Sequence, residues 1–331
     1  MKKTILAALI TTAAFNISTA LAKEAVTITQ ENYELVETYQ ALKNIHKLVG
    51  ENKFFHFRNP TPLDNQTVVR MNHDTLYSGY VTDMSKGGTI TLPETGDRYI
   101  SVMVVLKDHY INQFFTGGGT YEIAADDGFG MIVVRTEINA NDPEDVKLVN
   151  QLQDQVKIEM GSNTQFNPPN YDLDTLLEMR HRYAAEAATK GSLNNMQGAR
   201  GEVDPYMHIL GTAAGWGLLP DRNARYLSYT HEGGSTDCVS ATYDIPPFRD
   251  PGFFSITMYD KEGWIANNNA VLNKHNIVMK DENSFDVSFG DCSDAKKKVN
   301  HLPTTEGWNF LMRVYEPNLD KLDNYIIPTA K

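Results

Sequence analysis

The segment of the sequence with the most chemical potential is a polar run over residues 70–77 (RMNHDTLY). A histidine beside a carboxylate could move a proton near neutral pH, with Asp74 either holding the tautomer of His73 or binding a cation. In a regular strand, Arg70 and Asn72 would share one face and His73 the other. The same groups could instead form a buried hydrogen-bonded network that fixes the strand in place, and this is the interpretation we favour.

A second polar segment covers residues 200–208 (RGEVDPYMH). Asp204 before a proline is typical of a helix N-terminus. Arg200 and Glu202 are then free to face a cleft, and His208 lies one turn into the helix, where the positive end of the helix dipole favours the neutral imidazole. The small-residue run over residues 211–217 (GTAAGWG), which contains Trp216, indicates that a strand or a ligand packs closely there.

A third candidate is Arg313, which would share a strand face with Leu311 and Tyr315. A half-buried arginine needs a carboxylate or a ligand anion, and we favour a structural pair with an Asp or Glu. The candidate catalytic residues are therefore His73, Asp74, Glu202 and His208. The candidate ligand-binding residues are Arg70, Asn72, Tyr77, Arg200, Trp216 and Arg313.

No familiar metal, nucleotide or nucleophile signature accompanies these residues. His-Glu-x-x-His, Gly-x-Ser-x-Gly, Walker, Cys-x-x-Cys and EF-hand patterns are all absent from the sequence. Residues 293–296 (SDAK) match Ser-x-x-Lys, but they fall in a polar turn and we expect no nucleophile there. We predict no metal and no cofactor.

The first 22 residues are expected to form a cleavable signal peptide. Lys2 and Lys3 are followed by an apolar run over residues 5–15, and the end of the segment fits cleavage after Ala22. No later stretch reaches the roughly 20 apolar residues of a membrane-spanning helix. We therefore expect a periplasmic or secreted protein without a membrane span in the mature chain.

Charge and cysteine content fit that compartment. The formal net charge of the chain is −12, and it becomes −14 once the two leader lysines are lost. Because no basic run remains, a nucleic-acid partner is not expected. In an oxidising compartment Cys238 and Cys292 could form a disulfide that closes a loop of about 54 residues, although two separate buried thiols are the alternative.

Periodicity predicts the elements that position these residues. Helices are expected over residues 30–49, 143–160, 172–190 and 205–214. Strands are expected over residues 67–72, 75–84, 89–92, 99–106, 239–245, 253–259, 285–289 and 310–315, with a hairpin made of residues 121–124 and 131–138. Segregated strands and helices indicate an α+β, mainly β fold with two antiparallel sheet units. We expect an N-terminal β-rich domain over 23–140, a helical connecting region over 141–217 and a C-terminal β-sandwich domain over 218–331.

Three ordered motifs resemble a bacterial family built from two paired domains of unknown function, numbered 1254 and 1214. The first domain is similar to residues 72–77 (NHDTLY), 92–93 (LP) and 98–99 (RY), and the junction to 201–205 (GEVDP) and 211–217. The second is similar to residues 251–260 (PGFFSITMYD), 300–303 (NHLP) and 313–317 (RVYEP). The family often has another residue at the position of His73, which argues against a shared catalytic histidine. The resemblance implies a secreted or envelope protein with two β-sandwich, jelly-roll-like units and a helical block between them, and it implies no activity.

Two functional hypotheses follow. The first is an exported envelope protein that binds a small polar molecule or a glycan between its two sandwiches. The alternative is a metal-independent hydrolase or lyase that uses His73 or His208 with an Asp or Glu in the cleft between the domains. The oligomeric state is left open. Convergence of the candidate residues in one open pocket would favour the enzyme, and scattered or sealed residues would count against it.

Overall fold

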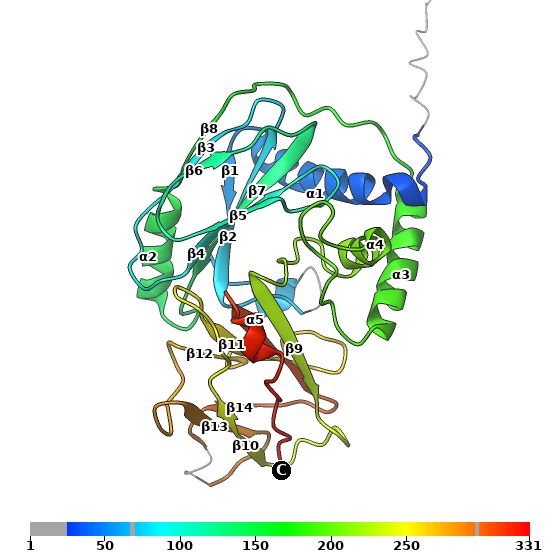
Figure 1. Cartoon of the computed structure of the whole chain (residues 1–331). Helices are drawn as coiled ribbons and strands as arrows, with labels where there is room; N and C mark the ends of the chain where they lie inside the picture. Colours follow the sequence, from blue (N-terminus) through cyan, green and yellow to red (C-terminus); the bar gives the residue numbers. More distant parts are fainter. Residues whose placement is uncertain (1–24, 67–69, 295–297) are drawn as a thin grey trace, which may run out of the picture.

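The computed structural model describes residues 25–66, 70–294 and 298–331. The expected signal peptide, part of the strand expected over residues 67–72, and Ala295 and Lys296 of the Ser-x-x-Lys pattern lie outside the described residues. Figure 1 shows two β-rich units, one above the other, with α1, α3 and α4 grouped on one side of the upper unit. In the part of the chain described, no helix has the length and apolar character needed to cross a bilayer.

The N-terminal unit consists of two antiparallel sheets packed face to face. The larger sheet has five strands in the order β1-β2-β7-β4-β5, and the smaller has the order β6-β3-β8. Ile90, Val104 and Ile132 lie in the core between them. The strands are β1 (Phe54–His56), β2 (Thr75–Asp83), β3 (Gly88–Leu92), β4 (Ile100–Val105), β5 (Gln113–Thr116), β6 (Gly119–Ile123), β7 (Phe129–Glu137) and β8 (Lys157–Met160).

Three local expectations for this unit are wrong. Residues 70–72, expected at the end of a strand over 67–72, form no strand, because Arg70 adopts a left-handed turn conformation. β6 and β7 form no hairpin, because β6 pairs with β3 while β7 lies between β2 and β4 in the other sheet. β7 is almost wholly buried, so it belongs in the middle of a sheet rather than at an edge. The helix that begins after Asp142 ends early, as α2 (Pro143–Gln153), and the chain returns as β8. The sequence of β8 (KIEM) alternates polar and apolar residues, which is typical of a half-buried strand.

Three helices form a block against the other face of the large sheet. α1 (Tyr33–Val49), α3 (Leu173–Thr189) and α4 (Pro205–Ala214) share a core that contains Tyr33, Leu176 and Leu210. Asp172 and Asp204 cap α3 and α4 by accepting backbone N–H bonds, from Asp174 at 3.1 Å and from Tyr206 at 2.9 Å. Short helical turns occur at η1 (Gln30–Asn32), η2 (Leu63–Asn65) and α5 (Leu319–Leu322).

The C-terminal unit is a second pair of sheets. One sheet has the order β12-β11-β15-β9 and is antiparallel, and the other has the order β10-β13-β14, with β13 and β14 parallel. Ile256, Phe285 and Phe310 are fully buried between the two sheets. The strands are β9 (Ala224–Thr230), β10 (Val239–Asp244), β11 (Phe254–Tyr259), β12 (Val271–Asn273), β13 (Ser284–Phe289), β14 (His301–Leu302) and β15 (Asn309–Tyr315).

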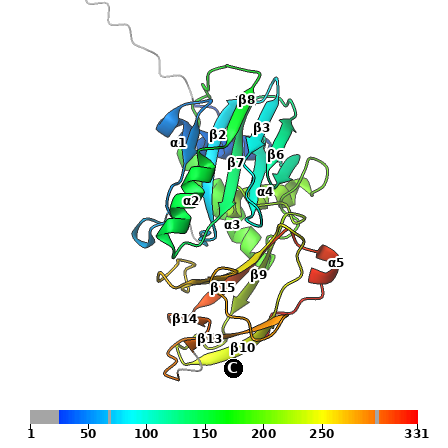
Figure 2. The same cartoon turned by 90° about the vertical axis from the view of Figure 1, so that its left-hand side faces the viewer.

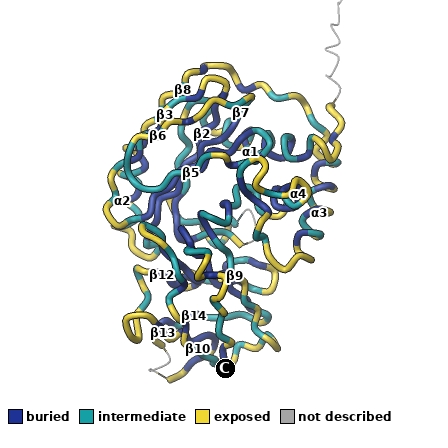
Figure 3. Tube along the Cα trace, in the orientation of Figure 1, coloured by how far each residue is buried: buried dark blue, intermediate teal, exposed yellow. Residues whose placement is uncertain are grey.

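The predicted disulfide is confirmed. Cys238 and Cys292 are bonded, with their Cα atoms 4.7 Å apart. The bond joins the residue before β10 to the turn after β13, at the end of the unit farthest from the helices (Figures 1 and 2). The mainly β, α+β class is confirmed as well, and Figure 3 shows the buried chain running through the middle strands of the upper unit.

Candidate functional site

The large sheet of the C-terminal unit has two chemically different faces. Along β11, Phe254, Ile256 and Met258 alternate with Ser255, Thr257 and Tyr259. The apolar set packs in the core of the unit. The hydroxyl-bearing set faces the N-terminal unit, because Ser255 bonds the carboxylate of Asp74 and Tyr259 donates to the Met71 carbonyl at 2.8 Å. The two units therefore meet through a polar sheet face, which we call the junction.

Arg313 lies at the centre of this polar face. In the register of the sheet it stands opposite Tyr226 on β9 and opposite Ser255 on β11. Its face is the one predicted, shared with Tyr315, and its side chain is 3 % exposed. The expected carboxylate ion pair is not formed among the described residues. Instead the guanidinium donates to the carbonyls of Arg70 at 2.9 Å and Met71 at 3.3 Å, and to the hydroxyls of Thr257 at 2.9 Å and Tyr259 at 2.8 Å.

Arg70 takes part through its backbone rather than its side chain. It has a φ of 56°, a left-handed conformation that costs free energy for a residue with a side chain and that turns its carbonyl toward Arg313. Its guanidinium lies 5.6 Å from the centre of the Tyr259 ring, and the residue is exposed.

Asn72 and Asp74 connect the units from the N-terminal side. The Asn72 amide donates to the Tyr315 hydroxyl at 2.7 Å, and its oxygen accepts from the Asp74 backbone N–H at 2.6 Å. Asp74 is completely buried, with one carboxylate oxygen bonded to Ser255 and the other, Oδ1, without a hydrogen bond in the described structure. Burial raises the pKa of Asp74, while nearby Arg313 opposes that shift.

His73 faces away from this network. Its Nε2 donates to the Thr61 carbonyl at 3.2 Å, and burial lowers its pKa, which favours the neutral imidazole. No hydrogen bond joins its ring to Asp74 among the described residues. His73 therefore lacks the oriented carboxylate partner that a proton-transferring histidine would need.

The large sheet of the N-terminal unit carries a row of polar side chains across β2, β7 and β4 that faces the junction. This row contains a charged residue that the sequence analysis did not single out. Arg135 on β7 stands opposite Tyr77 on β2 and Ser101 on β4. It is 5 % exposed, its guanidinium lies 5.1 Å from the centre of the Tyr77 ring, and it donates to the Gly217 carbonyl at 2.7 Å. Tyr77 itself is only partly buried. A signal was present in the sequence, since Arg135 and Glu137 occupy alternate positions of an otherwise apolar strand.

Glu137 forms a charged contact between the units beside this row. Its buried carboxylate lies 2.7 Å from Lys274 Nζ and 2.9 Å from His275 Nε2, both on the loop that follows β12. Burial alone would raise the pKa of Glu137, but these partners hold it below its ordinary value.

The other predicted histidine belongs to a separate aromatic cluster around α4. His208 donates from Nε2 to the Asp108 carbonyl at 3.0 Å and stacks on Tyr110 at 3.8 Å, and burial lowers its pKa. Next to it lies His109, also missed from the sequence, which bonds Thr212 and accepts from the Gly217 N–H at 2.8 Å. Trp216 stacks on His109 at 5.3 Å. Like His73, His208 contacts a backbone carbonyl and has no carboxylate partner among the described residues.

Close packing around α4 is provided by the protein itself. A Cβ atom on Gly211 would approach the Met196 carbonyl to 2.6 Å, so a neighbouring loop requires the small residue there. Arg200 and Glu202 lie near the surface in ion pairs. Arg200 bridges Asp108 at 2.8 Å and Asp126 at 2.6 Å, and Glu202 pairs with Arg222.

The candidate residues thus do not converge in one pocket. Asn72, Asp74, Tyr77 and Arg313 meet at the junction, whereas Arg200, Glu202 and His208 surround the start of α4. Within the described ranges, no group of three or more His, Cys, Asp or Glu residues could hold a metal ion.

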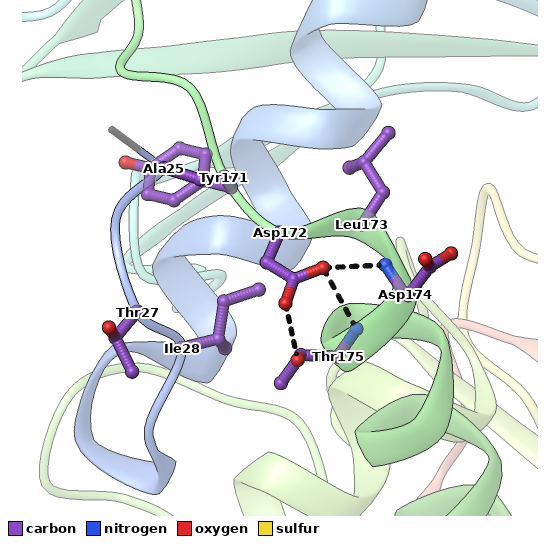
Figure 4. A pocket seen from close by; sticks show the side chains of 8 residues that line it. All are labelled: Ala25, Thr27, Ile28, Tyr171, Asp172, Leu173, Asp174 and Thr175. Carbon is purple, nitrogen blue, oxygen red and sulfur yellow. Dashed lines mark hydrogen bonds between the residues drawn. The ribbon is translucent and has the colours of Figure 1, made fainter. Parts of the chain in front are cut away.

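A hollow near the start of α3 lies apart from both clusters. It has a volume of about 400 Å³ and is lined by Ala25, Thr27, Ile28 and residues 171–175 (Figure 4). Asp172, which lines it, is occupied as a helix cap and accepts from the Thr175 hydroxyl at 2.8 Å. None of the residues predicted from the sequence as site residues lines this hollow.

The fold and the junction define a mainly β protein of two sheet units joined through buried polar side chains. Family models identify the units: "Protein of unknown function (DUF1254)" matches residues 51–122, and "Protein of unknown function (DUF1214)" matches residues 228–319. The chain carries both domains of the pair that its motifs resemble. No protein with a curated description matches the sequence.

Two solved structures share the fold. A protein from Vibrio parahaemolyticus is 15 % identical with a TM-score of 0.71, over 91 % of this chain and 97 % of its own. An uncharacterised protein from Burkholderia cenocepacia is 13 % identical with a TM-score of 0.50, over 91 % of this chain and 88 % of its own. At these identities the likeness concerns the fold alone.

Proposed function

We propose that this protein is exported and binds a small polar molecule or a glycan at the junction of its two sheet units. The observation that carries ligand binding is the chemistry of the two facing sheets. Both present buried charged and hydroxyl groups, including Arg135 and Arg313, which form no carboxylate ion pair among the described residues. Tyr77 and Tyr226, which flank them, remain only partly buried. Burying a charged group without a counter-charge costs free energy, and hydrogen bonds from a polar ligand would offset part of that cost.

Export is supported by the composition of residues 1–22 and by the disulfide, since disulfides persist in oxidising compartments. The hydrolase or lyase alternative has less support. His73 and His208 lie in different clusters, and each donates to a backbone carbonyl. In the part of the chain that the structure describes, neither ring is hydrogen-bonded to a carboxylate that would orient it as a general base.

A thermal-shift screen of the mature protein against sugars, organic acids, peptides and divalent metals tests ligand binding. A ligand that binds only the native state raises the melting temperature by mass action. We expect one ligand class to raise it in the wild type and less in Tyr226→Ala, while Tyr206→Ala, an exposed tyrosine on α4, responds as the wild type does. His73→Ala should also respond normally. No shift with any class would overturn the binding proposal, and a protein that stays in the cytoplasm with residues 1–22 intact would overturn export.

A further inference from the structure

Of the two arginines buried in the described structure, Arg135 makes fewer hydrogen bonds to oxygen and has more hydrogen-bonding capacity to spare. Arg313 makes four hydrogen bonds to oxygen atoms, which hold its guanidinium in place. Arg135 makes one such bond, to the Gly217 carbonyl, and another contact is the thioether sulfur of Met103 at 3.7 Å. The Tyr77 side chain is a further partner of the guanidinium. Sulfur is a weak acceptor, so N–H donors of Arg135 remain available for a ligand.

Among the described residues, no carboxylate forms an ion pair with Arg135. A guanidinium stays protonated when buried, and burying it without a counter-charge costs free energy. Its charge interacts mainly with tyrosine side chains, namely Tyr77, Tyr226 and Tyr99. The acidic residue on the same face of β7 is Glu137, but Lys274 and His275 already hold that carboxylate. An anion from outside the chain would complete the site.

The surroundings of Arg135 indicate which kind of anion. One free guanidinium balances one negative charge, and its planar fork matches a carboxylate in a two-bond geometry. Aromatic rings border it, with Tyr77 and Tyr226 partly buried. A phosphate dianion would need more hydrogen-bond donors than Arg135 alone can provide. A carboxylate would balance the charge of Arg135, and a small apolar or aromatic body attached to it would pack against the tyrosine rings.

We propose that Arg135 binds the carboxylate group of a small organic acid at the junction, whereas Arg313 holds the junction together. This inference rests on the proposed binding function and names its ligand class. From the sequence, Arg70, Arg200 and Arg313 were the candidate ligand-binding arginines, a structural role was favoured for Arg313, and Arg135 was not singled out.

Benzoate and benzamide test the charge requirement, because they share a shape and differ in charge. We expect benzoate, and not benzamide or sulfate, to raise the melting temperature of the wild-type protein. Arg135→Met should weaken benzoate binding at least about tenfold in calorimetric titration, and Arg135→Lys, which keeps the charge but loses the fork, should weaken it less. Arg225→Met is the matched control, since Arg225 is a partly buried arginine already paired with Asp221 and Asp323.

Trp216 offers a second readout that does not depend on stability. Gly217 accepts from Arg135 and donates to His109, whose ring stacks on Trp216. Benzoate should therefore change the fluorescence of the wild type and of Arg225→Met, with no change in Trp216→Phe. If Arg135→Met does not fold, Arg135→Lys decides, and wild-type affinity in that variant overturns the inference.

The outcomes separate the two proposals. Equal responses to benzoate and benzamide, an equal response to sulfate, or unchanged binding by Arg135→Met would overturn carboxylate recognition by Arg135. A response to neutral sugars with none to any acid would overturn this inference and leave the binding function standing. Silence toward every ligand class would overturn both.

Discussion

Replacing Arg313 by methionine should destabilise the protein by about 3 kcal/mol. Each hydrogen bond from a charged donor contributes about 1.5–3 kcal/mol. The Thr257 and Tyr259 hydroxyls can find other partners, so we count only the two bonds to the Arg70 and Met71 carbonyls, which gives about 3–6 kcal/mol. The buried guanidinium no longer has to be desolvated in the variant, and this gain offsets part of the loss.

The same variant should lose more stability at high pH than at low pH. Burial raises the pKa of Asp74 in the folded protein, and Arg313 limits that shift. Without the arginine the folded-state pKa rises further, so the folded state loses stability as pH rises through that pKa. Urea unfolding of wild type and Arg313→Met at about pH 5 and about pH 8 measures both effects.

Arg249→Met is the control for this comparison, because the Arg249 side chain is 57 % exposed and should change the unfolding free energy by less than about 0.5 kcal/mol. An Arg313→Met protein as stable as this control would refute the argument that Arg313 holds the two units together.

Three further predictions follow from the same contacts. Changing Cys238 and Cys292 to alanine should cost about 4 kcal/mol in urea unfolding, because the bond closes a loop across a sequence separation of 54, and no loss would show that the disulfide contributes nothing. Glu34→Gln should stabilise the protein by about 2 kcal/mol at about pH 8 and hardly at about pH 4. Burial raises the Glu34 pKa to about 7, so the wild type loses stability as pH rises through that value. An equal gain at both pH values would contradict this reasoning. Glu137→Gln should destabilise the protein by about 2–4 kcal/mol at neutral pH and less in acid. The depressed pKa of Glu137 contributes stability that is lost as pH falls through that pKa. A pH-independent difference in thermal unfolding would count against the ion pairs.

Alternation along single strands was the part of this fold that could be predicted. It located the residues of β11 and β15, and it placed Arg313 on one face with Tyr315, as the structure has it. The helix starts could also be predicted, because the capping signal lies in neighbouring residues. Asp142, Asp172 and Asp204 each cap the expected helix.

The sequence did not reveal which strands pair with each other or which groups contact each charged side chain. The position of β7 between β2 and β4 depends on contacts between residues far apart in the chain, and so the hairpin with β6 was wrong. The acceptors of Arg313 are carbonyls of a turn whose direction depends on the φ of Arg70, and carbonyls carry no side-chain signal. Arg135 was different, because an arginine and a glutamate at alternate positions of a buried strand can be found from the sequence alone.

The place of β7 in its sheet also limits how this protein can be divided. The first family match ends at residue 122, before β7 begins, yet β7 is the strand that joins β2 to β4. A fragment cut at that boundary would expose two unpaired strand edges, and such edges invite aggregation. The segment that the family model matches and the unit that can fold are therefore different pieces of chain. Any exchange of parts between relatives would have to include β7 with Arg135 and Glu137.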